Sequence, residues 1–132
     1  MLSHFVNFRC IVILIIESQL KNHKTVDVDF ATRGLIKFCN EYNNYKLLTI
    51  LVRKYNASVF DVYHYSIVWG CQKVFDNITN DFYDVIDFEW TEQAINIALQ
   101  FKKIDMVCYV INKMNTFHPE SYEKLKYLLT SI

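Results

Sequence analysis

Apolar residues recur at helical spacing in two long stretches of the chain. One face of residues 45–55 is apolar, and it carries Tyr45, Leu48, Leu51, Val52 and Tyr55. One face of residues 104–114 is also apolar, with Ile104, Val107, Cys108, Ile111 and Met114. A spacing of three or four residues indicates an amphipathic α-helix that buries one face. Another amphipathic stretch precedes each of these two, so the pattern predicts two helix pairs.

The two predicted pairs are copies of one unit. Residues 31–56 overlay residues 90–115 without a gap, and their apolar and polar positions coincide along almost the whole length. The N-terminal residues 7–15 overlay residues 44–52, which places them in the second helix of a further unit. Internal similarity of this kind is typical of stacked repeat proteins.

A partial copy lies between the two pairs. Residues 63–72 overlay residues 31–40, so that Cys71 takes the place of Cys39 and Ile67 that of Leu35. The overlay ends after Val74. For the stretch between Asn77 and Phe88, the sequence leaves open a short helix around residues 81–87 or an irregular loop.

Two other segments complete the prediction. A last helix begins at Pro119, because proline suits the first turn of a helix. Val26, Val28 and Phe30 alternate with aspartates, a pattern typical of an extended connector. The apolar side of the last helix is formed by Tyr122, Leu125, Leu128, Leu129 and Ile132.

These elements predict an all-α fold, a short solenoid of stacked antiparallel helix pairs with about seven or eight helices. We expect residues 1–132 to form a single helical-repeat domain. Apolar residues make up 52% of the chain, enough to form a core, and there are only two glycines and one proline. Sandwiches and barrels need many tight turns, so this composition disfavours them.

The unit resembles the ankyrin repeat, particularly the divergent copies common in large DNA viruses. Residues 93–98, Gln-Ala-Ile-Asn-Ile-Ala, match the place of that family's Thr-Pro-Leu-His-x-Ala signature. Residues 102–107, Lys-Lys-Ile-Asp-Met-Val, match the stretch that follows, and Asn43 stands where the family has glycine. The resemblance covers about residues 5–115. A different helix-pair solenoid and a compact helical bundle are the alternatives.

The resemblance implies a protein-binding scaffold with no catalytic groups and no cofactor. It implies that partner contacts fall on the first helix of each unit and on the loop before it. By position these contacts are Arg33, Glu41, Tyr42, Tyr65, Lys73, Glu92, Gln100 and Phe101. The alternative for Tyr42 and Phe101 is that they pack between units.

Charge is segregated along a chain whose net charge is zero. Residues 57–101 have a balance of −6, whereas residues 1–56 have +4 and residues 102–132 have +2. Segregated charge can steer a basic partner or another copy of the chain. A solvated acidic face without a partner is the alternative.

The sequence favours no catalytic chemistry. The four histidines are scattered, no Cys-x2-Cys pair occurs, and Gly34 and Gly70 stand alone, so zinc and phosphate motifs are absent. A Cys71–His64 pair formed by folding is a less favoured alternative. Nucleic-acid binding through the basic and aromatic residues of the first half is a further alternative. It is less favoured because nucleic-acid-binding proteins normally carry a basic excess, and this chain has none.

Residues 10–16 are apolar nearly all round the predicted first helix. A membrane span needs about 20 apolar residues, so we predict no membrane contact here. We predict instead a homo-oligomer formed through Ile13 and Ile16. An oligomeric structural or virion-associated protein is therefore the alternative to the binding module.

The composition of the chain indicates its cellular compartment and its origin. The four dispersed cysteines are typical of buried thiols in a reducing compartment, so we expect a cytoplasmic protein. The chain is rich in residues with AT-rich codons, such as Ile, Asn and Lys. That bias hints at an AT-rich genome, and for a viral protein the host cytoplasm or the virion is the expected place.

Overall fold

This computed structural model describes residues 2–21 and 27–131, which form α-helices joined by short turns and linkers. The predicted all-α class is therefore confirmed, since those two ranges contain no strand. In chain order the helices are α1 (Leu2–Lys21), α2 (Val28–Glu41), α3 (Tyr45–Tyr55), α4 (Val59–Val68), α5 (Gln72–Phe82), α6 (Phe88–Gln100), α7 (Ile104–Phe117), α8 (Pro119–Leu125) and α9 (Tyr127–Ser131).

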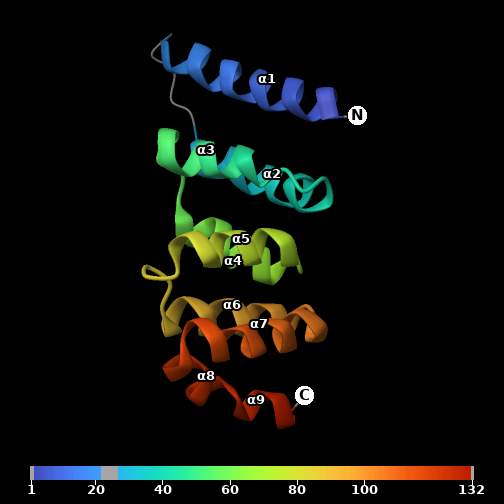
Figure 1. Ribbon diagram of the computed structural model, residues 1–132, viewed down its shortest axis with the longest axis vertical. Helices are drawn as coiled ribbons and strands as arrows, with labels where there is room; N and C mark the ends of the chain where they lie inside the picture. The colour runs from blue at the N-terminus through green and yellow to red at the C-terminus, as the bar shows by residue number, and fades with distance from the viewer. Residues whose placement is uncertain (1, 22–26, 132) are drawn as a thin grey trace.

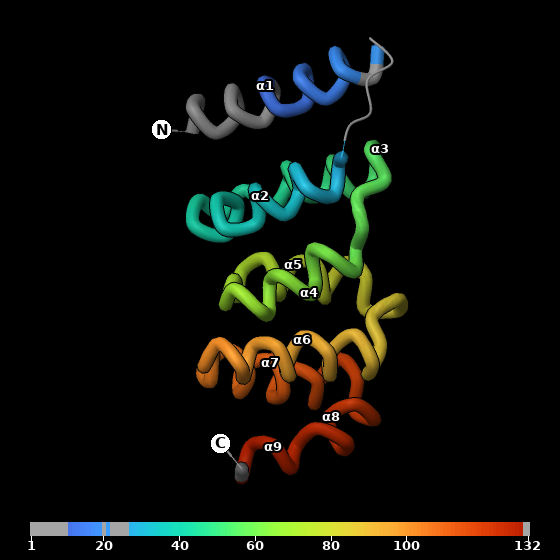
Figure 2. The backbone as a smooth tube through the Cα atoms, turned by 180° about the vertical axis from the view of Figure 1, so that it is seen from behind, coloured from blue at the N-terminus to red at the C-terminus, as the bar shows by residue number. Residues whose placement is uncertain are grey.

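The helices stack in layers along the long axis of the molecule (Figure 1). Three successive layers are the pairs α2/α3, α4/α5 and α6/α7, with α1 at one end of the stack and α8 and α9 at the other. The turns inside the pairs lie along one edge, here called the turn edge, formed by residues 41–46, 69–73 and 100–105. The linkers between pairs, residues 56–58 and 83–87, lie along the opposite edge, here called the linker edge (Figure 2).

The second helices of the three pairs are built alike. They begin at Tyr45, Gln72 and Ile104, so successive units are spaced by 27 and then 32 residues. Their buried residues fall at the same places: Leu47, Leu48, Leu51 and Val52 in α3, Val74, Phe75, Ile78 and Thr79 in α5, and Met106, Val107, Val110 and Ile111 in α7. Each helix buries one stripe because its neighbours shield that stripe from water.

The predicted register of the middle unit is wrong by five residues. The N–H of Cys71 donates to the carbonyl of Ser66 at 2.7 Å. The equivalent bonds join Asn44 to Cys39 and Lys103 to Ala98, both at 2.9 Å. Ser66, not Cys71, therefore takes the place of Cys39. The offset of 32 fails because α4 has 10 residues where α6 has 13, and the linker 56–58 before α4 is two residues shorter than the linker 83–87 before α6. The middle unit is a complete helix pair, and α5 continues to Phe82 before the linker.

Side-chain caps fix where the first helices begin. The Asp27 carboxylate accepts the N–H of Phe30 at 2.9 Å, and that of Asp87 accepts the N–H of Trp90 at 2.9 Å. In α4 the hydroxyl of Ser58 accepts the N–H of Asp61 at 3.1 Å. The predicted extended connector is therefore wrong at Val28 and Phe30, because an N-cap residue satisfies the free N–H groups of a first turn. Val26 lies outside the described residues.

Contacts between successive units hold the stack together. The buried hydroxyls of Tyr63 in α4 and Thr91 in α6 lie 2.7 Å apart. Asn40 in α2 accepts the N–H groups of Lys73 and Val74 at the start of α5, at 2.9 and 3.2 Å. Buried polar groups that are paired in this way cost little and fix one arrangement of the units.

Helix α1 takes the place of a second helix in the stack and runs in the same direction as α3 (Figures 1 and 2). The Glu17 carboxylate accepts a hydrogen bond from the Tyr55 hydroxyl at 2.5 Å and lies 3.1 Å from Lys54 Nζ. Ile16 is only 3% exposed because the chain itself covers it, and Ile13 is half-buried. The predicted oligomer contact is therefore wrong at Ile16.

The C-terminal helix begins at Pro119, as predicted, but ends at Leu125, and α9 follows from Tyr127. Leu125 is buried, and Leu128 and Leu129 pack against the core. Ile132 lies outside the described residues. Within residues 2–21 and 27–131, no helix is long and apolar enough to span a lipid bilayer.

Candidate protein-binding surface

An aromatic residue ends the first helix of every pair. Tyr42, Trp69 and Phe101 are the C-cap residues of α2, α4 and α6. The residue after each has a positive φ, namely Asn43 (55°), Gly70 (72°) and Lys102 (58°). This left-handed conformation ends a helix and turns the chain toward the next one. Because the three turns share one geometry, the three rings lie at equivalent places along the turn edge.

The rings are accessible to differing degrees and two of them are braced. Phe101 is 63% exposed and Tyr42 43%, while Trp69 is half-buried. The ring centroids of Tyr42 and Phe38 lie 4.8 Å apart, and those of Trp69 and Tyr65 lie 4.7 Å apart. Packing against a second ring holds Tyr42 and Trp69 in place, so binding a partner costs them little conformational entropy.

Lysines surround the aromatic residues of the turn edge. Lys46, Lys73, Lys102 and Lys103 are all exposed there, against two exposed acids, Glu41 and Asp105. In addition, Lys37 Nζ lies 5.3 Å from the ring centre of Trp69. A recess of about 280 Å³ opens between the turns of the middle and third pairs, and its lining includes Trp69, Lys102 and Lys103. The turn edge thus combines apolar rings with positive charge.

The second linker, on the linker edge, is rich in acidic residues. The acids around it are Asp81, Asp84, Asp87 and Glu89, all exposed. Asp87 caps α6, but no lysine or arginine occurs between Lys73 and Lys102 in the sequence. The acids therefore gather at the second linker, and two cations lie beside it: the Arg53 guanidinium is 5.1 Å from the ring centre of Phe82, and Lys124 Nζ is 4.9 Å from that of Phe88.

The structure divides the predicted contact residues into three groups. Glu41, Tyr42, Lys73, Gln100 and Phe101 lie on the turn edge. Glu92 is exposed in the first half of α6, toward the linker edge, and is separated from them. Arg33 and Tyr65 belong to the contact between α2 and α4 and form the third group.

Arg33 joins two units. Its guanidinium pairs with the carboxylate of Asp61 at 2.7 Å and lies 5.7 Å from the ring centre of Tyr65. The hydrogen bond to Asp61 raises the pKa of Arg33 above its ordinary value. Arg33 and Tyr65 therefore act mainly in packing between units.

Sequence reasoning missed Trp69. The five-residue error in the middle unit set Tyr42 opposite Val74 instead of Trp69. Gly70 was the signal that could have corrected it, because a glycine after an aromatic residue matches Asn43 after Tyr42. With that register, the aromatic residue at each turn becomes visible in the sequence.

Burial disfavours the charged forms of the cysteine and histidine side chains in the core. Burial raises the pKa of the Cys39 thiol to about 12 and also raises that of Cys71. Burial lowers the pKa of His64. Cys71 Sγ lies 3.9 Å from the carbonyl of Trp69, and a protonated thiol is a poor nucleophile. The side chain of Cys10 lies outside the described part of the chain.

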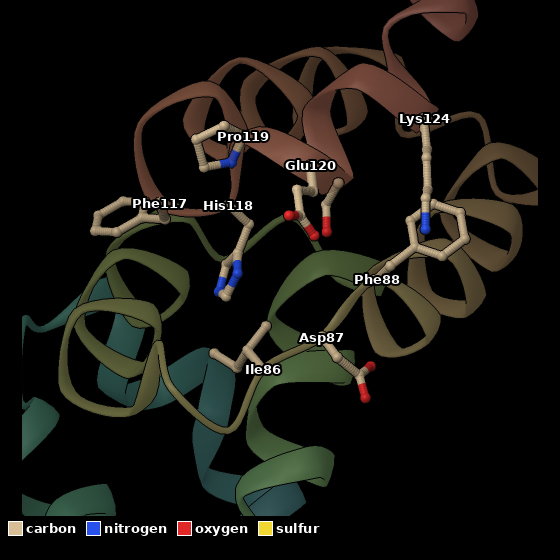
Figure 3. A pocket seen from close by; sticks show the side chains of 9 residues that line it. Ile86, Asp87, Phe88, Phe117, His118, Pro119, Glu120 and Lys124 are labelled. Carbon is tan, nitrogen blue, oxygen red and sulfur yellow. The ribbon is translucent and has the colours of Figure 1, made fainter.

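A cavity of about 480 Å³ lies where the second linker meets the start of α8 (Figure 3). His118, Phe88 and Lys124 are among its lining residues, and Lys124 Nζ lies 4.9 Å from the ring centre of Phe88. The carboxylates at the cavity come from Asp87 and Glu120. Across residues 2–21 and 27–131, no three His, Cys, Asp or Glu side chains are grouped to hold a metal ion.

No family model, no curated protein and no solved structure matches this chain.

Proposed function

We propose that the chain is a non-catalytic protein-binding module whose turn edge takes an extended acidic segment of a partner protein. The observation that carries the proposal is the row of equivalent aromatic residues, Tyr42, Trp69 and Phe101, among exposed lysines. The resemblance to ankyrin repeats points to the same class of function.

The aromatic rings and the lysines of the turn edge contribute to binding in different ways. Large aromatic side chains bury much apolar area at low entropic cost and dominate the energy of many protein interfaces. The lysines of the turn edge steer an acidic segment toward the rings and fix its orientation. One ring per unit favours an extended partner, because such a segment can cross successive units.

A protein partner fits better than nucleic acid. The net charge is zero and the second linker is rich in acids, so the phosphate backbone of a long nucleic acid would meet repulsion as well as attraction. A short acidic peptide contacts the turn edge alone and avoids that repulsion.

The second candidate function is an oligomeric structural or virion-associated protein. Exposed apolar residues at the N-terminal end of the stack, including Leu14 and Phe30, favour self-association. The host cytoplasm or the virion stays the predicted location.

The module is tested with a display library of random linear peptides selected against the full chain. Selected peptides should combine acidic and aromatic or aliphatic residues, and their affinity should fall as salt is added. Phe101→Ala should weaken binding about tenfold or more, as expected for an interface anchor. Lys103→Glu should also weaken it.

The matched control is Tyr83→Ala, which removes a ring that is 55% exposed on the linker edge. It should leave peptide affinity unchanged. The proposal is wrong if the selection enriches no acidic peptides, or if Phe101→Ala and Lys103→Glu bind the selected peptides as the wild type does.

A further inference from the structure

A groove between α1 and α2 marks the N-terminal end of the stack. Its volume is about 370 Å³, and its lining includes Val12, Ile15, Phe30, Ala31 and Leu35. Phe30 is 69% exposed and Ile15 is 52% exposed. The groove is largely apolar, and Asp27, the carboxylate at its rim, already caps α2.

The repeat shows what shape fits this groove. Each first helix packs against the first helix of the unit before it, as α4 packs on α2 and α6 on α4. With spacings of 27 and 32 residues, Leu35 in α2 is equivalent to Val62 in α4 and Ala94 in α6. Val62 and Ala94 are fully buried, whereas Leu35 lines the groove and is partly buried. The groove therefore lies where a preceding first helix would pack, and its natural occupant is an apolar helix face.

An apolar helix face of this kind borders the groove. Ile11 and Leu14 on α1 are 53% and 63% exposed, and they form with Ile15 an unpaired stripe next to the groove. The chain therefore carries the groove and a matching helix side by side. When two copies pair about a two-fold axis, the exposed stripe of each copy covers the groove of the other, because both copies use the same self-complementary surface.

We propose that two copies of the chain pair about a two-fold axis, with α1 of each copy in the α1–α2 groove of the other. Ile11, Leu14 and Ile15 supply the exposed apolar area of the contact, whereas Ile16 lines the groove with only 3% of its surface exposed. Zero net charge lets two copies approach without overall repulsion. This surface lies at the end of the stack, separate from the turn edge, so the dimer leaves the proposed peptide site open.

Sedimentation equilibrium from 1 to 200 µM tests the pairing. The wild type should approach a mass twice the chain's 15.8 kDa as the concentration rises. Leu14→Glu should remain at the monomer mass over the whole range, because it places a charge in the apolar contact. Phe30→Ser, on the facing wall of the groove, should weaken association as well.

Phe101→Glu is the matched control, because Phe101 and Leu14 are equally exposed at 63%. It should dimerise like the wild type. Circular dichroism checks that each variant keeps its helical content, and Phe30→Ser serves if Leu14→Glu does not fold.

A wild-type monomer at every concentration overturns the pairing. So does a dimer that survives both Leu14→Glu and Phe30→Ser, since its contact must lie elsewhere. Peptide binding at the turn edge is measured on the wild type as well, and a wild type that stays monomeric yet binds acidic peptides refutes the dimer without refuting the module.

Discussion

Helices α1 and α5 hold equivalent places in the stack but have different surroundings. Both occupy the place of a second helix, and α1 is the more apolar of the two. In α5 the buried stripe lies between neighbours, and Phe75 packs against the rings of Tyr63 and Tyr109 at 5.7 and 6.0 Å. In α1 one side faces the stack, and Leu14 faces outward. The comparison shows that an apolar residue of an amphipathic helix is buried only where another helix of the stack packs against it.

Phe75→Ala gives the largest expected effect. Removing a fully buried ring loses its transfer free energy and leaves a cavity, so the free energy of unfolding should fall by about 3–5 kcal/mol. Leu14→Ala in α1 should change it by less than about 0.5 kcal/mol in the monomer. Urea denaturation at low protein concentration measures both. Equal losses at the two positions would show that α1 is as well packed as α5.

A second comparison is between the left-handed residues in the turns of the middle and third pairs, Gly70 and Lys102. Gly70→Ala should destabilise the protein by about 1–2 kcal/mol, because a side chain in the left-handed conformation is strained. Lys102→Gly should stabilise it by about 1 kcal/mol for the same reason. Thermal unfolding measures the two shifts.

Gly34→Ala is the control for these glycine changes. Gly34 lies inside α2, and a Cβ there would meet no atom within 4 Å, so alanine should stabilise the helix by about 1 kcal/mol. If Gly70→Ala also stabilised the protein, the equivalence of the three turns would fail.

Lowering the pH should reduce the stability of the fold through His64, which lies in α4. Burial lowers the pKa of this imidazole in the folded state below its ordinary value of 6.5. The unfolded chain therefore binds a proton more readily, so stability is complete above pH 6.5 and falls as the pH drops through the folded-state pKa. His64→Phe, which keeps a ring beside Phe60, should flatten the melting temperature between pH 7 and pH 5. An unchanged pH dependence in this variant would assign the effect to another group.

The smallest expected effect concerns the polar attachment of α1. The hydrogen bond from Tyr55 and the charge of Lys54 lower the pKa of Glu17. This contact is exposed, so Glu17→Gln should leave global unfolding almost unchanged. It should speed amide hydrogen exchange in α1 and leave exchange in α5 as it was. Exchange that rises equally in both helices would show that α1 opens only with the whole stack.

The sequence by itself determined the helices and the unit. The gapless overlay of residues 31–56 on 90–115 corresponds to α2/α3 and α6/α7, whose turns and buried stripes coincide. This prediction succeeds because apolar spacing is local information, and because the ends of α2 and α6 and the starts of α3 and α7 are both 59 residues apart. Pro119 likewise marks the start of α8, because its ring fixes a backbone angle.

The tertiary structure corrected the register of the middle unit, which Gly70 already signals in the sequence, and it alone decided the surroundings of each face. The shorter α4 and the shorter linker before it make the unit spacing 27 residues instead of 32, and the closing bond from Cys71 to Ser66 reveals Trp69 as the third ring of the turn edge. Ile16 and Leu14 are apolar neighbours in one helix, yet one is buried and the other exposed. Spacing predicts which residues share a face. Burial depends on which helices pack against that face, and these helices contact it from positions distant in sequence.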